Sequence, residues 1–364
     1  MMNISVMRPK LPSAKRLIPY LEKIDTARWY SNYGPLVHVL EERLATHYGL
    51  AVGAVTTVAN ATLGLTLALA AQGVRPGTLC ALPAWTFVAS AHAVTMAGMV
   101  PYFVDVDQDS WALEPDRIDS ILAEAPSEVG AVMPVAPFGR PVDSAAWDRF
   151  QARTSLPVVI DAAAAFDSIR PGKVPSVVSL HATKAFAVGE GGFVMSTDTA
   201  LVRDVRMRAN FGFNAQRESM MPATNAKLSE YHAAIGLAMF DEWSEVRGQW
   251  MTAAQTYRRL FVGSNHLRFL GGFGEDWIAA VCLLWLRNST QGQLAKALAY
   301  AGIETKAWWG VGAHAYPATA AYPRARLAAT ELLAGSTIGM PFYRDMTEDE
   351  IGRVAEATFA AIDV

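Results

Sequence analysis

Short apolar runs alternate with segments of helical periodicity over much of the chain. The apolar runs fall at residues 78–82, 102–106, 131–135, 158–160, 177–180 and 192–196. Between most of them lie segments with helical spacing of apolar positions, such as residues 63–71, 87–97 and 116–125. This alternation predicts an α/β fold with a mostly parallel sheet flanked by helices.

The last part of the chain has a different pattern. A long helical segment, residues 228–259, is followed by a strand candidate at 277–286, a helix at 291–301, an aromatic loop and a final helix from Thr347. We therefore expect a smaller C-terminal α+β domain. The change of domain is placed inside the long helix near Trp243, which gives a large domain over residues 1–243 and a small one over 244–364.

The composition agrees with two domains and excludes some functions. A length of 364 residues fits two domains of ordinary size. Charged residues make up 18% of the chain, against about 25% in ordinary soluble proteins, so either the core is large or another subunit covers part of the surface. The net charge of −3 provides no basic field for a phosphate backbone, which argues against nucleic-acid binding.

Cysteine usage and the apolar segments indicate the compartment. Cys80 and Cys282 lie far apart without a CxxC motif, so neither a disulfide framework nor a structural zinc site is expected. No spacing of histidines suggests a metal. The first ten residues lack the apolar core of a signal peptide. Residues 84–100 are slightly short of a membrane span and contain polar side chains, so they predict a buried helix. We expect a cytoplasmic protein with no membrane association.

Two segments place reactive side chains after predicted strands, where open α/β sheets bind their ligands. Asp161 follows the run 158–160 and precedes four alanines, so its carboxylate is expected to face a cation, although a turn or helix cap would also account for it. Lys184 follows the run 177–180 and precedes a Gly-Glu-Gly-Gly turn at 189–192. A buried lysine can act as a nucleophile and Schiff-base former, whereas a surface lysine is the simpler alternative.

Two further segments suggest how a ligand could be held. Residues 58–62, Val-Ala-Asn-Ala-Thr, begin a helix whose free N–H groups would attract phosphate. Residues 83–87, Pro-Ala-Trp-Thr-Phe, form an aromatic cluster directly after a strand, which could equally be core. A lysine, an acid, a phosphate cradle and an aromatic ring are together what pyridoxal phosphate requires. The sequence therefore predicts this cofactor.

With these motifs the chain resembles the sugar aminotransferases of the DegT–DnrJ–StrS group, which are fold-type I pyridoxal-phosphate enzymes. Residues 179–184 followed by 189–192 match the Schiff-base segment of that group. Residues 101–107, 223–234, 302–305 and 340–341 are similar to other landmarks of the group. The resemblance extends from Gly34 to the final helix.

The resemblance implies roles for the residues at the cofactor. Lys184 would be the Schiff-base lysine, and Asp161 would hold the pyridine nitrogen. Thr62, the amide of Ala61 and Ser179 would hold the phosphate. Phe87 would stack on the ring. Trp85, next to Phe87, would be packing. The group often has Gln or His three residues after the aspartate, whereas this chain has Ala164, so another group or water would contact the 3-hydroxyl.

The resemblance also implies a partner subunit and a substrate region. Asn225 would reach the cofactor phosphate of the other subunit, so we expect a homodimer with shared active sites. Trp308, Trp309 and His314 lie where the small domain of the group approaches the substrate. His181 is either structural or directed at the active site.

The expected activity is transfer of an amino group from an amino acid, with L-glutamate as the expected donor, to a nucleotide-linked keto-deoxysugar. One alternative is an enzyme of the same family that acts on a carbocyclic ketone, and another is a non-catalytic homologue that binds the cofactor. Members that deoxygenate sugars have His in place of the lysine, so Lys184 argues against that reaction.

Overall fold

The computed structural model describes residues 3–287 and 290–362. Its main sheet contains β1 (Val55–Val58), β2 (Leu79–Pro83), β3 (Val100–Val104), β4 (Val129–Val132), β5 (Ile160–Asp161), β6 (Ser176–Ser179) and β7 (Gly192–Met195). The hydrogen-bonded orders are β3-β2-β4 and β5-β6-β7-β1. Parallel bridges from Val132 to Val158 and from Val135 to Asp161 join the two halves. The pairings of β2 with β3 and β4, and of β5 with β6, are parallel, while β7 runs antiparallel to both of its neighbours.

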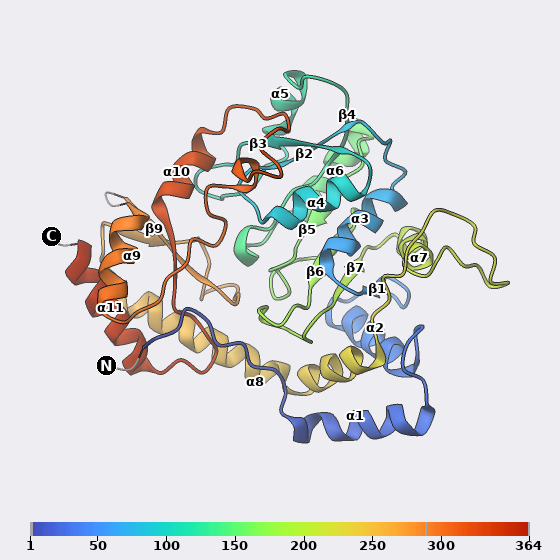
Figure 1. The fold of residues 1–364 in the computed structure, drawn as a ribbon, viewed down its shortest axis with the longest axis horizontal. Coiled ribbons are helices and arrows are strands. Elements are labelled where there is room, and N and C mark those ends of the chain that lie inside the picture. The colour runs from blue at the N-terminus through green and yellow to red at the C-terminus, as the bar shows by residue number, and fades with distance from the viewer. Residues whose placement is uncertain (1–2, 288–289, 363–364) are drawn as a thin grey trace.

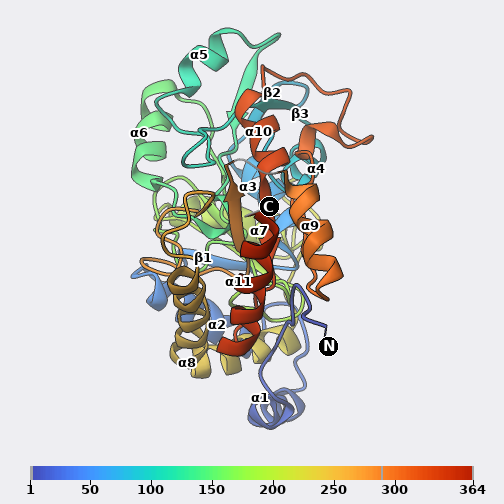
Figure 2. The same ribbon diagram turned by 90° about the vertical axis from the view of Figure 1, so that its left-hand side faces the viewer.

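Helices surround this sheet, as Figures 1 and 2 show. They are α2 (Pro35–His47), α3 (Ala61–Ala71), α4 (Val88–Met96), α5 (Ile118–Ala123), α6 (Ser144–Thr154) and α7 (Thr199–Arg208), while α1 (Ala14–Ala27) lies away from the sheet against the long helix of residues 230–260. Helix α3 packs against α4, α7 and the strands β6 and β7. Because α3 is apolar on all sides, its burial between these elements is what its sequence favours.

The C-terminal part is an antiparallel sheet with helices. It contains α8 (Glu230–Leu260), β8 (Leu267–Phe269), β9 (Cys282–Leu286), α9 (Gln291–Tyr300), α10 (Ala328–Ser336), β10 (Thr337–Met340) and α11 (Glu348–Ile362). The strand order is β10-β9-β8. Helix α8 packs against α1 and α2, and also against α11 (Figure 1). The expected α/β fold with a smaller α+β part is confirmed. The boundary near Trp243 stays a prediction, because that residue lies within the continuous helix α8.

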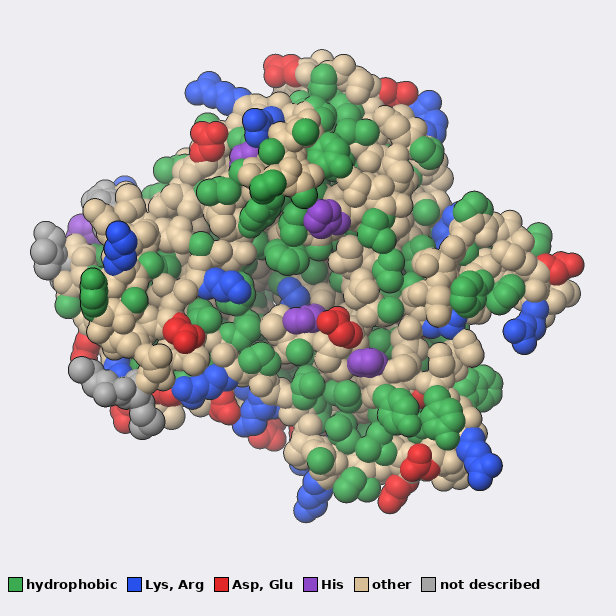
Figure 3. Space-filling view, viewed as in Figure 1, with side chains coloured by type: hydrophobic (Ala, Val, Ile, Leu, Met, Phe, Trp, Pro, Cys, Tyr) green, Lys and Arg blue, Asp and Glu red, His purple; other side chains and the backbone are tan. Residues whose placement is uncertain are grey.

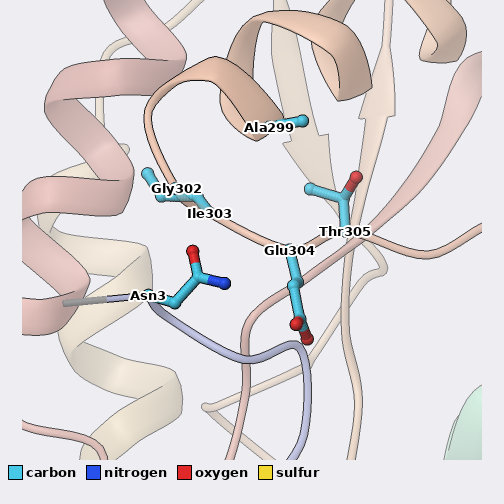
Figure 4. A pocket seen from close by; sticks show the side chains of 6 residues that line it. All are labelled: Asn3, Ala299, Gly302, Ile303, Glu304 and Thr305. Carbon is cyan, nitrogen blue, oxygen red and sulfur yellow. The ribbon is translucent and has the colours of Figure 1, made fainter. Parts of the chain in front are cut away.

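The N-terminal segment joins the C-terminal part. Ile4 forms a parallel bridge with Ile303, and the carboxylate of Glu304 accepts a hydrogen bond from the Val6 amide at 3.0 Å. Figure 4 shows the shallow hollow at this junction, lined by Asn3, Ala299 and residues 302–305. The Glu304 side chain that lines this hollow thus fastens the N-terminal segment.

Several expected elements differ in extent. The strand expected at 277–286 begins only at Cys282. Trp277 instead forms an isolated parallel bridge with Phe273, and its Nε1 donates to the Gly271 carbonyl at 3.1 Å. Strand β1 was not expected, since Thr56 and Thr57 interrupt its apolar pattern although both are buried. Of residues 84–100, helix α4 takes only Val88–Met96.

The expectations about membranes, cysteines and metals can be compared with the described residues. Among these residues no helix is long and apolar enough to cross a membrane. Cys80 and Cys282 are buried free thiols. Within residues 3–287 and 290–362, no cluster of His, Cys, Asp and Glu side chains could hold a metal ion.

Candidate active site

The strand ends of the main sheet bring the candidate residues together. Asp161 is the last residue of β5 and Ser179 is the last residue of the neighbouring strand β6. Lys184 lies in the loop from β6 to β7, which is closed by hydrogen bonds of Leu180 with the Gly191 carbonyl and the Val188 amide. Figure 3 shows that this face of the molecule is hollowed near its centre, where Lys or Arg, His and acidic side chains lie among hydrophobic ones.

The carboxylate of Asp161 is buried and held by two hydrogen bonds. Ser90 in α4 donates its hydroxyl to Oδ2 at 2.7 Å, and the Ala163 amide donates to Oδ1 at 3.1 Å. The Ser90 hydroxyl is also 2.8 Å from the hydroxyl of Thr86, and both residues are buried. Ser90 was not among the predicted site residues. The available signal was its position in α4, where it is fully buried whereas His92 is exposed and Thr95 half-buried.

The electrostatics of Asp161 and Lys184 are coupled. Burial raises the pKa of Asp161, while the Ser90 hydroxyl, the Ala163 amide and the charge of Lys184 each lower it, with burial dominant. Burial lowers the pKa of Lys184, and the negative charge of Asp161 partly offsets this. A lysine whose amine loses its proton more readily is suited to act as a nucleophile and a base.

The start of helix α3 is the segment predicted to cradle an anion. The side chain of Asn60 caps this helix by accepting from the Leu63 amide at 2.9 Å, which leaves the first amides of the helix free. Gly192, which pairs with Ser179, lies so close that a Cβ on it would be 2.9 Å from the Ala61 nitrogen. Thr62 is half-buried beside this point. Ser179 accepts from the His181 amide at 3.2 Å, so its hydroxyl hydrogen remains available to donate.

The two aromatic residues after β2 have different environments. Trp85 is buried and packs edge-on against Phe138 and Trp309 at ring-centroid distances of 6.2 and 5.4 Å. Phe87 precedes the first turn of α4 and is 59% exposed. Trp85 is therefore part of the core, whereas the ring of Phe87 is free to contact a ligand.

The aromatic loop of the C-terminal part packs against the large domain. Trp309 stacks on Phe138 at 3.6 Å. Gly139, the residue after Phe138, packs against the Ala164 carbonyl. A Cβ on Gly139 would be 2.7 Å from that carbonyl oxygen. Trp308 is half-buried, with the Nζ of Lys306 4.5 Å from its ring. Trp309 is thus connected to the segment after Asp161 through packing.

His314 lies at a separate hollow. It is buried against Phe103, with a ring-centroid distance of 6.3 Å, and borders a hollow lined also by Glu331 and residues 324–328. Burial lowers the pKa of His314, and the charge of Arg324 lowers it further. The residues that line this hollow do not include Lys184.

Asn225 lies on the surface beside the end of β1. It is exposed and forms an antiparallel bridge with Asn210. The next residue, Ala226, accepts a hydrogen bond from the Ala59 amide at 2.7 Å. The described chain leaves the side chain of Asn225 accessible to another molecule, and its predicted role across a subunit interface stays a prediction.

The residues present fit pyridoxal phosphate. Gly192 approaches the Ala61 nitrogen so closely that a Cβ would crowd it, which holds the start of α3 against the strand ends, and a helix start so placed suits a phosphate group. A buried carboxylate suits a protonated ring nitrogen, and a lysine of lowered pKa suits a carbonyl carbon. Each of these features lies at the ends of β1, β5 and β6 or the start of β7.

Comparison with known proteins agrees with this arrangement. The model of the DegT/DnrJ/EryC1/StrS aminotransferase family matches residues 13–359. The chain is 33% identical to a dTDP-4-amino-4,6-dideoxy-D-glucose transaminase of Shigella dysenteriae over 264 residues, covering 70% of each chain. It is 28% identical to a GDP-perosamine synthase of Caulobacter vibrioides, covering 98% of this chain and 97% of that protein.

A solved structure gives the same result. DesI, crystallised in the presence of its TDP-sugar product, superimposes with a TM-score of 0.88 at 29% identity, covering 100% of this chain and 95% of DesI. The fold is accordingly that of the fold-type I aminotransferases. The chain belongs to the DegT/DnrJ/EryC1/StrS aminotransferase family and is an aminotransferase that uses pyridoxal phosphate.

Proposed function

We propose that this enzyme transfers the amino group of an amino acid, with L-glutamate as the donor, to a keto-deoxysugar carried on a nucleotide. Two relatives are named for nucleotide-linked amino sugars, and DesI was crystallised with a TDP-sugar. The observation that carries the proposal is the convergence of Lys184, Asp161 and the α3 cradle at neighbouring strand ends.

The residues of this chain would divide the work as follows. When bound, pyridoxal phosphate would supply an acceptor for the amino group and for the electrons released at the donor α-carbon. Lys184 would hold the cofactor between turnovers, and its amine would move a proton at that α-carbon. Asp161 holds a proton on the ring nitrogen through its negative charge. The amides of Ala61 and Thr62 and the hydroxyl of Ser179 hold the phosphate, and Phe87 covers the ring.

The remaining assignments follow from the family and need their own tests. Trp308, Trp309 and His314 would contact the sugar nucleotide rather than the donor. Asn225 would act across a homodimer interface, consistent with its exposed position. Soluble, cytoplasmic operation remains our expectation.

Covalent trapping on Lys184 tests the core of the proposal. The purified enzyme should absorb in the visible, and borohydride should fix the cofactor on the peptide that contains Lys184. Lys184→Ala should fold, bind cofactor without the covalent link and lose steady-state transamination. Retained turnover in Lys184→Ala would contradict the assignment.

A panel of acceptors tests the substrate class. Enzyme first loaded with the amino group by L-glutamate should regain its original spectrum when a nucleotide-linked keto sugar is added. Recovery with a carbocyclic ketone alone would favour the alternative reaction, and a colourless protein that takes up no cofactor would favour the non-catalytic homologue.

A further inference from the structure

The crevice at Lys184 is lined by three segments that are far apart in the sequence. They are residues 7–10 of the N-terminal segment, residues 182–185 of the loop with Lys184, and residues 342–344 after β10, together with Trp250 and Ala280. The charged side chains among these lining residues are all cationic: Arg8, Lys10, Lys184 and Arg344. A partly closed crevice with charges of one sign favours an anionic ligand.

Arg344 differs from the other two cations that border Lys184. Arg8 pairs with Glu350 at 3.3 Å, and Lys10 pairs with Asp345 at 2.8 Å. Arg344 is only 8% exposed, and its buried Nε has no hydrogen-bond acceptor within the described residues. Buried charged groups are normally paired, so this guanidinium lacks the partner that its burial calls for.

The acidic residues near Arg344 do not supply that partner. The charges of Asp345, Glu242 and Glu245 act on Arg344 from a distance, but burial dominates and lowers its pKa. In the described part of the chain, Asp345 is paired with Lys10 and Glu242 with Arg16. The Arg344 guanidinium thus has a donor without a partner among the described residues, and Arg344 lines the same crevice as Lys184.

We propose that Arg344 binds a carboxylate of the amino-acid donor. The planar guanidinium matches a carboxylate through two parallel hydrogen bonds. The inference rests on the proposed function, in which Lys184 acts at the donor α-carbon, one bond from the α-carboxylate. The nucleotide diphosphate of the acceptor is the other anion that such a site could take, and the two half-reactions separate these possibilities.

The experiment follows each half-reaction of the holoenzyme by single-turnover visible spectroscopy. Arg344→Ala should raise the half-saturating concentration of L-glutamate by about tenfold or more, as loss of a charge-assisted hydrogen bond predicts. Arg344→Lys should give a half-saturating concentration between those of the wild type and Arg344→Ala. The half-saturating concentration of the acceptor should change by less than about threefold, which is less than the loss of one hydrogen bond would cause. Arg8→Ala is the matched control, because Arg8 lines the same crevice but already has a partner.

Binding without chemistry gives a second readout. Glutarate, which has no amino group to transfer, should bind the wild-type holoenzyme in calorimetry and bind Arg344→Ala more weakly by a similar factor. L-Alanine as donor locates the contact, because a loss seen also with alanine assigns Arg344 to the α-carboxylate, and a loss confined to glutamate assigns it to the side-chain carboxylate.

The opposing outcomes are distinct. Unchanged donor saturation and glutarate binding in a folded Arg344→Ala would overturn the inference, as would a loss confined to the acceptor half-reaction. If Arg344→Ala does not fold, Arg344→Lys and Arg344→Gln decide by the same two measurements. A wild-type enzyme that reacts with no amino acid would instead refute the proposed function, while glutarate binding would still report on Arg344.

Discussion

At the scale of single residues, the site depends on polar groups that are placed in apolar surroundings. Asp161 is buried among the ends of the sheet strands, where a carboxylate is costly unless its oxygens are hydrogen-bonded. The two bonds from Ser90 and Ala163 provide this. Ser90 is therefore a positioning residue, which acts on the cofactor only through Asp161.

Ser90→Ala should destabilise the cofactor-free protein by about 1.5–3 kcal/mol at neutral pH, the usual value for a hydrogen bond to a charged group. The folded-state pKa of Asp161 is already raised by burial, so the stability it contributes is present at acid pH and is lost as the pH rises through that pKa. Removing Ser90 raises the pKa of Asp161 further. The difference from wild type should therefore shrink toward acid pH in urea unfolding.

Ser90→Thr keeps the hydroxyl and serves as the control for this prediction. It should restore both the stability and the visible spectrum of the holoenzyme, which Ser90→Ala should alter. An equal loss in the two variants would mean that Ser90 matters for packing in α4 and does not position Asp161.

Gly192→Ala should weaken cofactor binding by about tenfold or more, equivalent to about 1.4 kcal/mol. The added methyl group would lie 2.9 Å from the Ala61 nitrogen, so it would push the first residues of α3 out of position. Titration of the cofactor-free protein measures this loss, and unfolding experiments measure any accompanying strain.

Gly248→Ala is a suitable comparison, because a Cβ there meets nothing within 4 Å. It lies inside α8, where replacing Gly by Ala should stabilise by about 0.5–1 kcal/mol without changing cofactor affinity. Tight cofactor binding by Gly192→Ala would contradict the position of the cradle.

At the scale of elements, one helix start depends on a residue from another helix. The carboxylate of Glu230, the first residue of α8, accepts from the amides of Leu36 and Val37 in α2 at 2.8 and 2.9 Å. Gly34, the N-cap of α2, has no side chain that could do this, and a Cβ there would be 2.7 Å from Glu230. The start of α8 thus caps α2.

Glu230→Gln should lower the free energy of unfolding by about 1.5–3 kcal/mol, because the negative charge at the start of α2 is lost with one of its two acceptors. Glu42→Gln is the matched control, because Glu42 is an exposed glutamate of α2, the helix that Glu230 caps. This substitution should change the free energy of unfolding by less than about 0.5 kcal/mol. Equal effects in chemical denaturation would contradict the capping role.

At the scale of the whole molecule, apolar and aromatic side chains remain exposed near Asn225. Phe211 and Met220 precede it in the same segment and are 46% and 59% exposed. Tyr231, in the first turn of α8, stacks on the exposed Tyr30 at 6.2 Å. A second copy of the chain would cover such groups, which agrees with the low charged fraction of the composition.

Mixing two inactive variants tests the shared active site. Lys184→Ala and Asn225→Asp chains should recover some activity together, because one site of each heterodimer then has both residues intact. No recovery despite heterodimer formation, shown by mass spectrometry, would mean that Asn225 serves its own chain beside Ala59. An active monomer at assay concentration would exclude the shared site.

Much of the fold and part of the site could be predicted from local sequence. The apolar runs gave the strands β2, β3, β6 and β7 within a few residues, because their side chains are buried on both faces of the sheet. Asp161 and Lys184 could be selected because polar residues at or shortly after the ends of buried strands lie at the ligand-binding edge of a parallel sheet.

The tertiary structure decided what depends on residues far apart in sequence. Ser90 lies 71 positions from Asp161, Glu230 caps a helix 194 positions away, and Arg344 reaches the Lys184 crevice only through the folding of the C-terminal part. Local periodicity encodes which face of an element is buried. It does not encode which polar group from another element meets that face, because the partner is set by packing of the whole chain.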